Sequence, residues 1–174
     1  EVINVGTGLV QERHTSDFWV FEGVDKRDYA VSGTWGADGT TYFWDVTDPA
    51  QIRKIDSIQV DARTVNDVKV SEDGRISVIS REGASSRRNG IVIIDTTNPY
   101  DVNIISEYTT NLTGGVHNVF IYQDHVFALS NGERFYVINI EDPKNPYEVG
   151  MFEIGEKGQA IHDVWIEDGI AYSS

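Results

Sequence analysis

Residues 91–99 read IVIIDTTNP, in which four β-branched residues are followed by an aspartate, two threonines and an Asn-Pro pair. Residues 42–49 (YFWDVTDP) and residues 135–143 (FYVINIEDP) repeat this pattern, and the prolines of the three copies recur at intervals of 50 and 44 residues. β-Branched and aromatic residues favour strands. An Asx-Pro pair favours a turn, because the Asx side chain bonds nearby backbone and proline fixes φ. The pattern therefore predicts a strand that ends in a tight turn, three times over.

Two further series keep phase with the first. One comprises residues 66–70 (NDVKV), 117–121 (HNVFI) and 162–166 (HDVWI), with 16–20 (SDFWV) as a weaker first copy. The other comprises apolar runs that each end in serine, at residues 29–32, 76–80, 126–130 and 170–173. Together they predict four short strands in each repeat. No window carries a sustained period of 3.6 residues with caps, so we expect almost no helix.

Four-stranded units that recur every ~40–50 residues are typical of the blades of a β-propeller. We therefore predict an all-β fold built of four-stranded antiparallel blades, with about three and a half blades in a single propeller segment, 1–174. A flat β-sandwich is the alternative, but it does not require three motif series in one order. The expected boundaries are 1–13 (the end of a blade), 14–62, 63–113, 114–158 and 159–174 (the start of a blade).

Three and a half blades do not close a ring, so a blade face and sheet edges would stay uncovered. We therefore expect these residues to belong to a longer chain, whose remaining blades are their first partner. The sequence opens with Glu1 rather than an initiator methionine, which fits this expectation.

The composition limits the classes of other partners and sites that the chain can have. The formal net charge is −14, which opposes binding to nucleic acid and to anionic membrane surfaces. The chain has no cysteine, so disulfides, thiolate metal sites and cysteine nucleophiles do not occur in it. No stretch approaches the roughly 18 apolar residues that a membrane span needs, so we expect no direct membrane span.

The run of residues 91–95, with its Thr-Thr-Asn-Pro turn, resembles the LVIVD repeat. The first copy is aromatic but keeps the Asp-Pro turn, and the third departs from the family by having Asn139 in place of Asp. Residues 161–164 (IHDV) and 116–119 (VHNV) are similar to the family's His-Asp-Val element, and the resemblance covers residues 14–174. It implies a propeller from an exported or surface protein of bacteria or archaea, in the periplasm, on the cell surface or secreted. The family has no general catalytic assignment.

The candidate ligand-binding residues lie at the start of the first strand of each blade, which lines the central channel of a propeller. We expect them near one mouth of that channel, where histidine and aspartate side chains could bind a divalent cation or hold a general base. The alternative is that they form hydrogen bonds which fix the blades and recur because the blades recur. The candidates are Asn66, Asp67, His117, Asn118, His162 and Asp163.

Three loop residues could contact a partner: Trp35, in the first long loop, and Arg87 and Arg88, in the only local basic segment. The alternatives are packing of Trp35 on its own blade and a solvated loop around the arginines. Asp45, Asp95 and Asn139 are interpreted as turn caps, because one short turn offers too few oxygen ligands for calcium.

Two functions follow from these observations. The first is a non-enzymatic, exported interaction scaffold that binds a protein partner or a surface glycan, with no catalytic residue, no metal and no cofactor. The supporting feature is an ordered repeat without an asymmetric catalytic cluster. The alternative is a metal-dependent enzyme or a ligand-binding protein, with a divalent cation or ligand held in the central channel.

Overall fold

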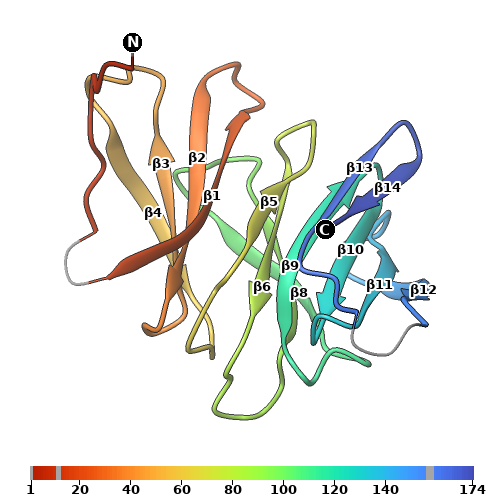
Figure 1. The fold of residues 1–174 in the computed structure, drawn as a ribbon. Coiled ribbons are helices and arrows are strands. Elements are labelled where there is room, and N and C mark those ends of the chain that lie inside the picture. The colour runs from red at the N-terminus through yellow and green to blue at the C-terminus, as the bar shows by residue number, and fades with distance from the viewer. Residues whose placement is uncertain (1, 11–12, 156–158) are drawn as a thin grey trace.

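The structure, a computed structural model, describes residues 2–10, 13–155 and 159–174. These residues form fourteen strands and no helix (Figure 1). Three antiparallel sheets have four strands each, and in each sheet the strands lie side by side in chain order. A two-stranded hairpin follows them. The expected all-β fold of four-stranded antiparallel units is confirmed.

The strands coincide with the predicted segments, although the second strand runs three residues beyond the predicted 29–32. The first sheet comprises β1 (His14–Glu22), β2 (Asp28–Trp35), β3 (Thr40–Asp45) and β4 (Arg53–Gln59). The second comprises β5 (Val68–Val70), β6 (Ile76–Arg81), β7 (Gly90–Asp95) and β8 (Asn103–Tyr108). The third comprises β9 (Val116–Tyr122), β10 (His125–Ser130), β11 (Arg134–Asn139) and β12 (Tyr147–Glu153). The hairpin comprises β13 (Val164–Glu167) and β14 (Ile170–Ser173).

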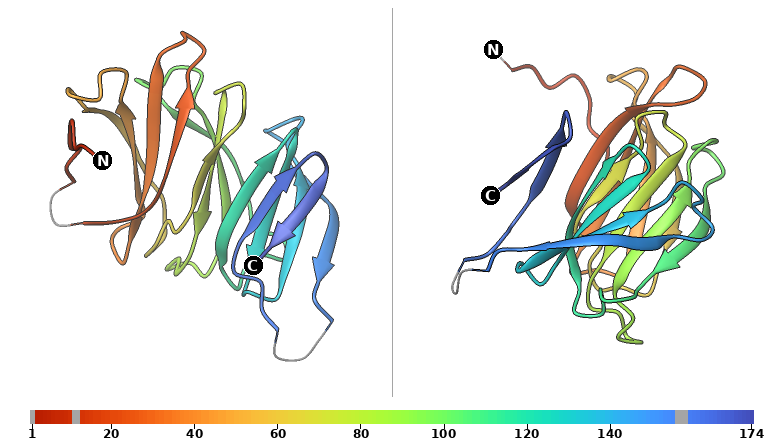
Figure 2. Two further views of the ribbon diagram at one scale, coloured as in Figure 1. Left: turned by 45° about the horizontal axis from the view of Figure 1, so that its top comes forward. Right: turned by 90° about the vertical axis from the view of Figure 1, so that its right-hand side faces the viewer.

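The three sheets follow one another face to face and form an open arc. The hairpin continues the arc and lies beside its inner strands (Figure 2). The inner strands are β1, β5, β9 and β13, and each contacts the next along the chain. Three apolar clusters fill the spaces between the first and second sheets, the second and third sheets, and the third sheet and the hairpin.

The central strand β7 shows why the deciding stretch is apolar throughout. Val92 and Ile94 pack into the cluster toward the first sheet, whereas Ile91 and Ile93 pack into the cluster toward the third. All four side chains are fully buried. Successive side chains of a strand point to opposite faces, so a strand between two other sheets must be apolar on both.

The Asx residue at the end of each third strand caps the turn that follows. Asp45 accepts the backbone N–H of Thr47 at 3.1 Å, Asp95 that of Thr97 at 2.9 Å, and Asn139 that of Glu141 at 3.0 Å. Aspartate and asparagine make this bond equally well, which explains why Asn139 can replace the usual aspartate. The interpretation of these residues as turn caps is confirmed.

Residues 2–10 form no strand. Gly6 lies against the backbone of Pro49, and Gly8 lies against the side chains of Trp44 and Ile52, so this segment rests on the outside of the first sheet. The expectation that residues 1–13 end a preceding blade stays a prediction, and residues 1, 11 and 12 lie outside the described ones. The boundary expected at residue 158 also falls outside the described residues. Within the described ranges, no helix has the length and apolar character to cross a membrane.

Candidate functional site

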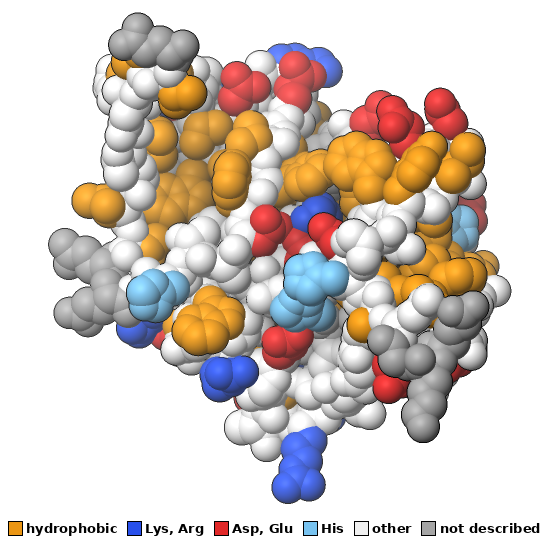
Figure 3. Space-filling view, in the orientation of Figure 1, with side chains coloured by type: hydrophobic (Ala, Val, Ile, Leu, Met, Phe, Trp, Pro, Cys, Tyr) orange, Lys and Arg blue, Asp and Glu red, His pale blue; other side chains and the backbone are white. Residues whose placement is uncertain are grey.

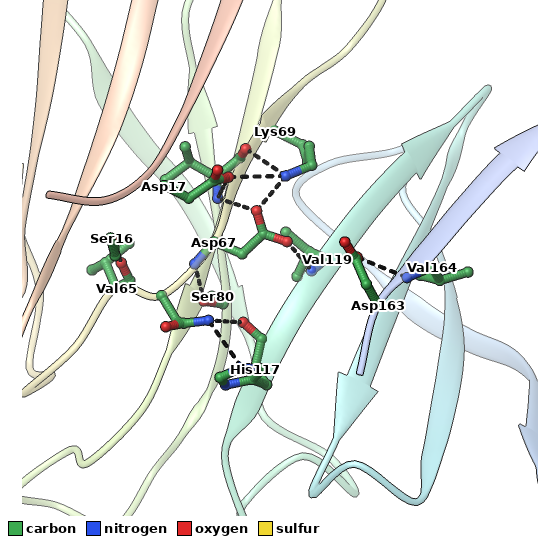
Figure 4. Close-up of polar contacts among 12 residues, drawn as sticks. Ser16, Asp17, Val65, Asp67, Lys69, Ser80, His117, Val119, Asp163 and Val164 are labelled. Carbon is green, nitrogen blue, oxygen red and sulfur yellow. Dashed lines mark hydrogen bonds and ion pairs between the residues drawn. The ribbon is translucent and has the colours of Figure 1, made fainter. Parts of the chain in front are cut away.

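The inner strands bring the four copies of the repeated element together (Figure 4). We number the positions of the element one to five, so that Asn66, Asp67 and Lys69 hold positions one, two and four of the second copy. Position one lies at the start of each inner strand, and we call this side of the molecule the polar end. Position four lies further along each inner strand, and we call that side the aromatic end.

Position two joins neighbouring sheets. The carboxylate of Asp67 accepts the backbone N–H of Val119 from the third sheet at 2.7 Å, and Asp17 accepts that of Val68 from the second sheet at 3.4 Å. Val68 also donates its N–H to its own neighbour Asp67 at 2.9 Å, as Val164 does to Asp163 at 2.7 Å. Asn118 breaks the series, since among the described residues the Val164 N–H bonds Asp163 and not Asn118. The side-chain oxygen of Asn118 is buried without a hydrogen-bond partner in the described structure.

Lys69 ties the first two members of this series together. Its ammonium group contacts the carboxylates of Asp17, at 3.0 Å, and of Asp67. Burial, together with a hydrogen bond to Asp17, raises the pKa of Asp67 to about 8, although Lys69 opposes this shift. Burial opposes ionisation of Asp17 as well, but its bonds to Asp67 and Lys69 outweigh that effect and lower its pKa. The pKa values of the two carboxyl groups therefore shift in opposite directions beside one buried ammonium group.

The side chains at position one also bond the next sheet, but some of their polar groups remain accessible from the surface. Ser16 donates its hydroxyl hydrogen to the carbonyl oxygen of Val65, and Asn66 donates its amide to that of His117 at 2.9 Å. The Nδ1 atom of His117 lies 3.1 Å from a carboxylate oxygen of Glu82. The ring of His162 meets that of His117 edge to face, with 5.1 Å between ring centroids. Three of the predicted candidates, Asn66, His117 and His162, are therefore brought together.

Position four gathers large side chains at the aromatic end. The rings of Trp19, Phe120 and Trp165 are mutual neighbours, with centroid separations of 4.8–6.5 Å. Lys69 completes the group, with its ammonium nitrogen 5.1 Å from the centre of the Trp19 ring. A hollow of about 430 Å³ opens beside them, between β1 and the final hairpin, and Asp163 also lines it.

Two smaller hollows open at the polar end. One, of about 280 Å³, is lined by Glu82, His117 and His162 together with glycines of the neighbouring loops. The other, of about 350 Å³, is lined by His14, Thr15, Ser16, Trp35 and Asn66. They adjoin, because Asn66 of the second hollow is bonded to His117 of the first.

The three predicted partner contacts lie at the polar end, with Arg87 and Arg88 in a loop as predicted and Trp35 in a strand instead. Trp35 ends β2 with about half of its side chain exposed, and its ring meets the ring of His14 edge to face. Arg87 and Arg88 are exposed in the loop between β6 and β7. Asp61 anchors this loop by accepting the backbone N–H groups of Ser85 and Ser86.

The predicted residues do not form one cluster. Asp67 is buried in the sheet junction, while His162 and Asp163 are exposed on the last hairpin. Within residues 2–10, 13–155 and 159–174, no three His, Asp or Glu side chains are placed to share a metal ion.

Sequence reasoning missed Lys69, Glu82 and His14 as members of these groups. Lys69 had a signal, since it is the only charged residue at position four among Trp19, Phe120 and Trp165. Glu82 and His14 had none, because each lies outside the repeated element.

The fold and the site together define an all-β chain of four-stranded antiparallel units. Aspartate side chains at position two join neighbouring inner strands by hydrogen bonds to backbone N–H groups. No family model matches this chain, and no curated protein sequence matches it. Among solved structures it is similar to the X-ray structure of a hypothetical selenium-binding protein from Sulfolobus tokodaii, with a TM-score of 0.64 and 14% sequence identity. The match covers 81% of this chain and 39% of that chain, so this chain spans about two fifths of its length. At this identity the likeness concerns the fold alone.

Proposed function

We propose that this chain is part of an exported β-propeller, and that it acts as a non-enzymatic scaffold for a protein partner or a surface glycan. Three and a half blades leave the arc open, and the matched solved structure is more than twice as long. Both observations support remaining blades in a longer chain, with β1, β5, β9 and β13 around the central channel. The resemblance to the LVIVD repeat supports an extracytoplasmic location.

The observation that carries the scaffold proposal is that the carboxyl group at position two bonds the neighbouring sheet. A general base or metal ligand needs a carboxylate that faces open space. The carboxylate of Asp67 instead contacts the Val119 N–H and the Lys69 ammonium group. Only 3% of Asp67 is exposed to solvent. The group that recurs in the sequence is therefore occupied in joining blades.

A ligand-binding channel is the second candidate, and one contact favours it. Because Glu82 lies against Nδ1 of His117, it can hold the proton on that atom and leave Nε2 as an acceptor in the wall of the smaller hollow, 3.5 Å from the Asn66 amide nitrogen. The description "selenium-binding" belongs to the matched protein, which is 14% identical, and this chain has no cysteine thiolate.

Metal analysis of the purified protein, together with the substitution His162→Ala, separates the two candidates. The scaffold proposal expects no stoichiometric metal, and the same circular dichroism spectrum and metal content in the variant. His125→Ala, in β10 and outside both hollows, is the matched control. Stoichiometric metal that is lost in His162→Ala but kept in His125→Ala would replace the scaffold with the channel site.

A further inference from the structure

The most variable position of the repeat lies at the polar end. Position two holds Asp in the first, second and fourth copies and Asn118 in the third, whereas position one holds Ser16, Asn66, His117 and His162. The position that recurs joins the sheets, and the position that varies lines the two hollows. Variation at an open position inside a regular repeat is what a binding site for an asymmetric ligand requires.

Trp35 and His14 are a second departure from the repeat at this end. They are cross-strand partners that extend the β1–β2 pairing beyond a bulge between Thr15 and Phe18, and the strand that corresponds to β1 in the second sheet, β5, is much shorter. The edge-to-face contact, with 6.4 Å between ring centroids, holds the indole in place and leaves 54% of the residue exposed. An indole held in this way offers an apolar face to a ligand.

The polar groups beside this indole are held in place before any ligand arrives. Asn66 is fixed through its amide nitrogen by the carbonyl of His117, and His117 is fixed through Nδ1 by Glu82. The Asn66 amide oxygen takes part in neither bond and belongs to the wall of the larger hollow, whereas the Nε2 atom of His117 lies 3.5 Å from the Asn66 amide nitrogen. Groups fixed in advance lose little conformational entropy on binding. Figure 3 shows histidine side chains at the centre of this face, with acidic side chains close to them.

We infer that the polar end binds a neutral carbohydrate, with Trp35 as the stacking platform and Asn66, His117 and Glu82 as the hydrogen-bonding groups. A pyranose ring presents an apolar C–H face that fits an indole ring, and its hydroxyl groups both donate and accept hydrogen bonds. The adjoining hollows, of about 350 and 280 Å³, hold a ligand of more than one sugar unit. This inference rests on the proposed non-enzymatic binding function, and it names the ligand.

The charge around the hollows favours a neutral ligand over an anionic one. The chain carries a formal net charge of −14, and Glu82 lies in the wall of the smaller hollow, so an anionic ligand is repelled. A neutral sugar avoids this repulsion and uses the uncharged donors and acceptors.

The test is an array of neutral, sialylated and sulfated oligosaccharides probed with the purified protein, followed by titration calorimetry with the best neutral oligosaccharide. We expect neutral glycans to bind, and Trp35→Ala to weaken binding about tenfold, as the loss of an aromatic anchor does elsewhere. Trp35→Phe keeps a ring and should restore part of the affinity. Tyr147→Ala, which removes an aromatic residue of equal exposure on β12, should bind as the wild type does.

Two outcomes overturn the inference. One is an array without a neutral glycan ligand, including the case in which a protein partner is found instead. The other is equal binding by Trp35→Ala and the wild type. Neither outcome touches the non-enzymatic scaffold, which fails only if the metal analysis and His162→Ala reveal a metal-dependent site.

Discussion

The carboxylate of Asp67 in the second sheet accepts the backbone N–H of Val119 in the third, with 2.7 Å between oxygen and nitrogen. Asp17 makes the equivalent bond from the first sheet to Val68 in the second. The first two sheets thus each present an acceptor to the sheet that follows in the chain, whereas Asn118 of the third sheet does not bond the Val164 N–H of the hairpin. The series defines a direction around the arc, from the first sheet toward the hairpin.

Asp67→Ala should lower the free energy of unfolding by about 2–4 kcal/mol, because it leaves the buried Val119 N–H without an acceptor and removes a partner of Lys69. Asp163→Ala is the matched control, since the same position is exposed in the last copy and bonds only its neighbour Val164. We expect it to cost no more than about 1 kcal/mol. Urea unfolding followed by tryptophan fluorescence measures both. Equal costs would contradict the junction role of Asp67.

The pH dependence of stability should reveal the raised pKa of Asp67. Its pKa rises from 3.8 to about 8 in the folded chain, so the folded state holds a proton that the unfolded state releases between these values. The contribution of Asp67 to stability is therefore full below pH 3.8 and is lost as the pH rises toward 8. Asp67→Asn resembles the protonated form at every pH. The destabilisation caused by Asp67→Asn should therefore shrink between pH 5 and pH 9 in urea titrations. A destabilisation that grows over this range would indicate an ordinary ionised carboxylate.

Tyr100→Phe should lower the free energy of unfolding by about 1–2 kcal/mol, because the Tyr100 hydroxyl donates a 2.7 Å bond from the second sheet to the buried carboxylate of Asp45. Burial alone would raise the pKa of Asp45, but the bonds from Tyr100 and Thr47 outweigh it and lower the pKa to about 2. The stability that Asp45 contributes is present above pH 3.8 and is lost as the pH falls toward 2. Acid unfolding of Tyr100→Phe should therefore depend less on pH in that range. Tyr147→Phe, on the exposed face of β12, should match the wild type.

Gly74→Ala should destabilise the chain more than Gly169→Ala, although both glycines lie in the turn after an inner strand. Their φ angles are nearly equal, +73° and +74°, so a side chain strains the backbone equally at both positions. A Cβ at Gly74 would also come within 2.4 Å of the carbonyl oxygen of Glu22 in the first sheet, whereas one at Gly169 meets nothing within 4 Å. We expect about 1 kcal/mol for Gly169→Ala and at least twice that for Gly74→Ala in thermal or urea unfolding. Equal values would show that the second sheet can move away from the first.

The architecture could be predicted because strand, turn and core leave separate marks in the sequence. Ile91 to Ile94 alternate between two apolar clusters, so the whole run had to be apolar, and Asp95 had to cap the next turn. Neither feature depends on distant residues. The order of the strands in each sheet then follows from the short connections, which favour antiparallel neighbours.

The site could be predicted only in part. Asn66, His117 and His162 were expected together because they hold one position of the repeat, and they meet. The burial of Asp67 was not visible in the sequence, because it depends on where the next sheet places the Val119 N–H. Glu82 was missed for the same reason, since its contact with His117 crosses from one sheet to the next.

The direction of the bonds between sheets has a consequence for how such a chain can lengthen. Because the second sheet offers a carboxylate on one side and a backbone amide on the other, a duplicate of its gene segment encodes a unit that already matches its parent at both junctions. A change at one junction, such as the asparagine at 118, leaves the others intact. A chain that lengthens by tandem duplication therefore does not need new complementary surfaces to evolve at the same time. The outward-facing loops can then diverge in sequence.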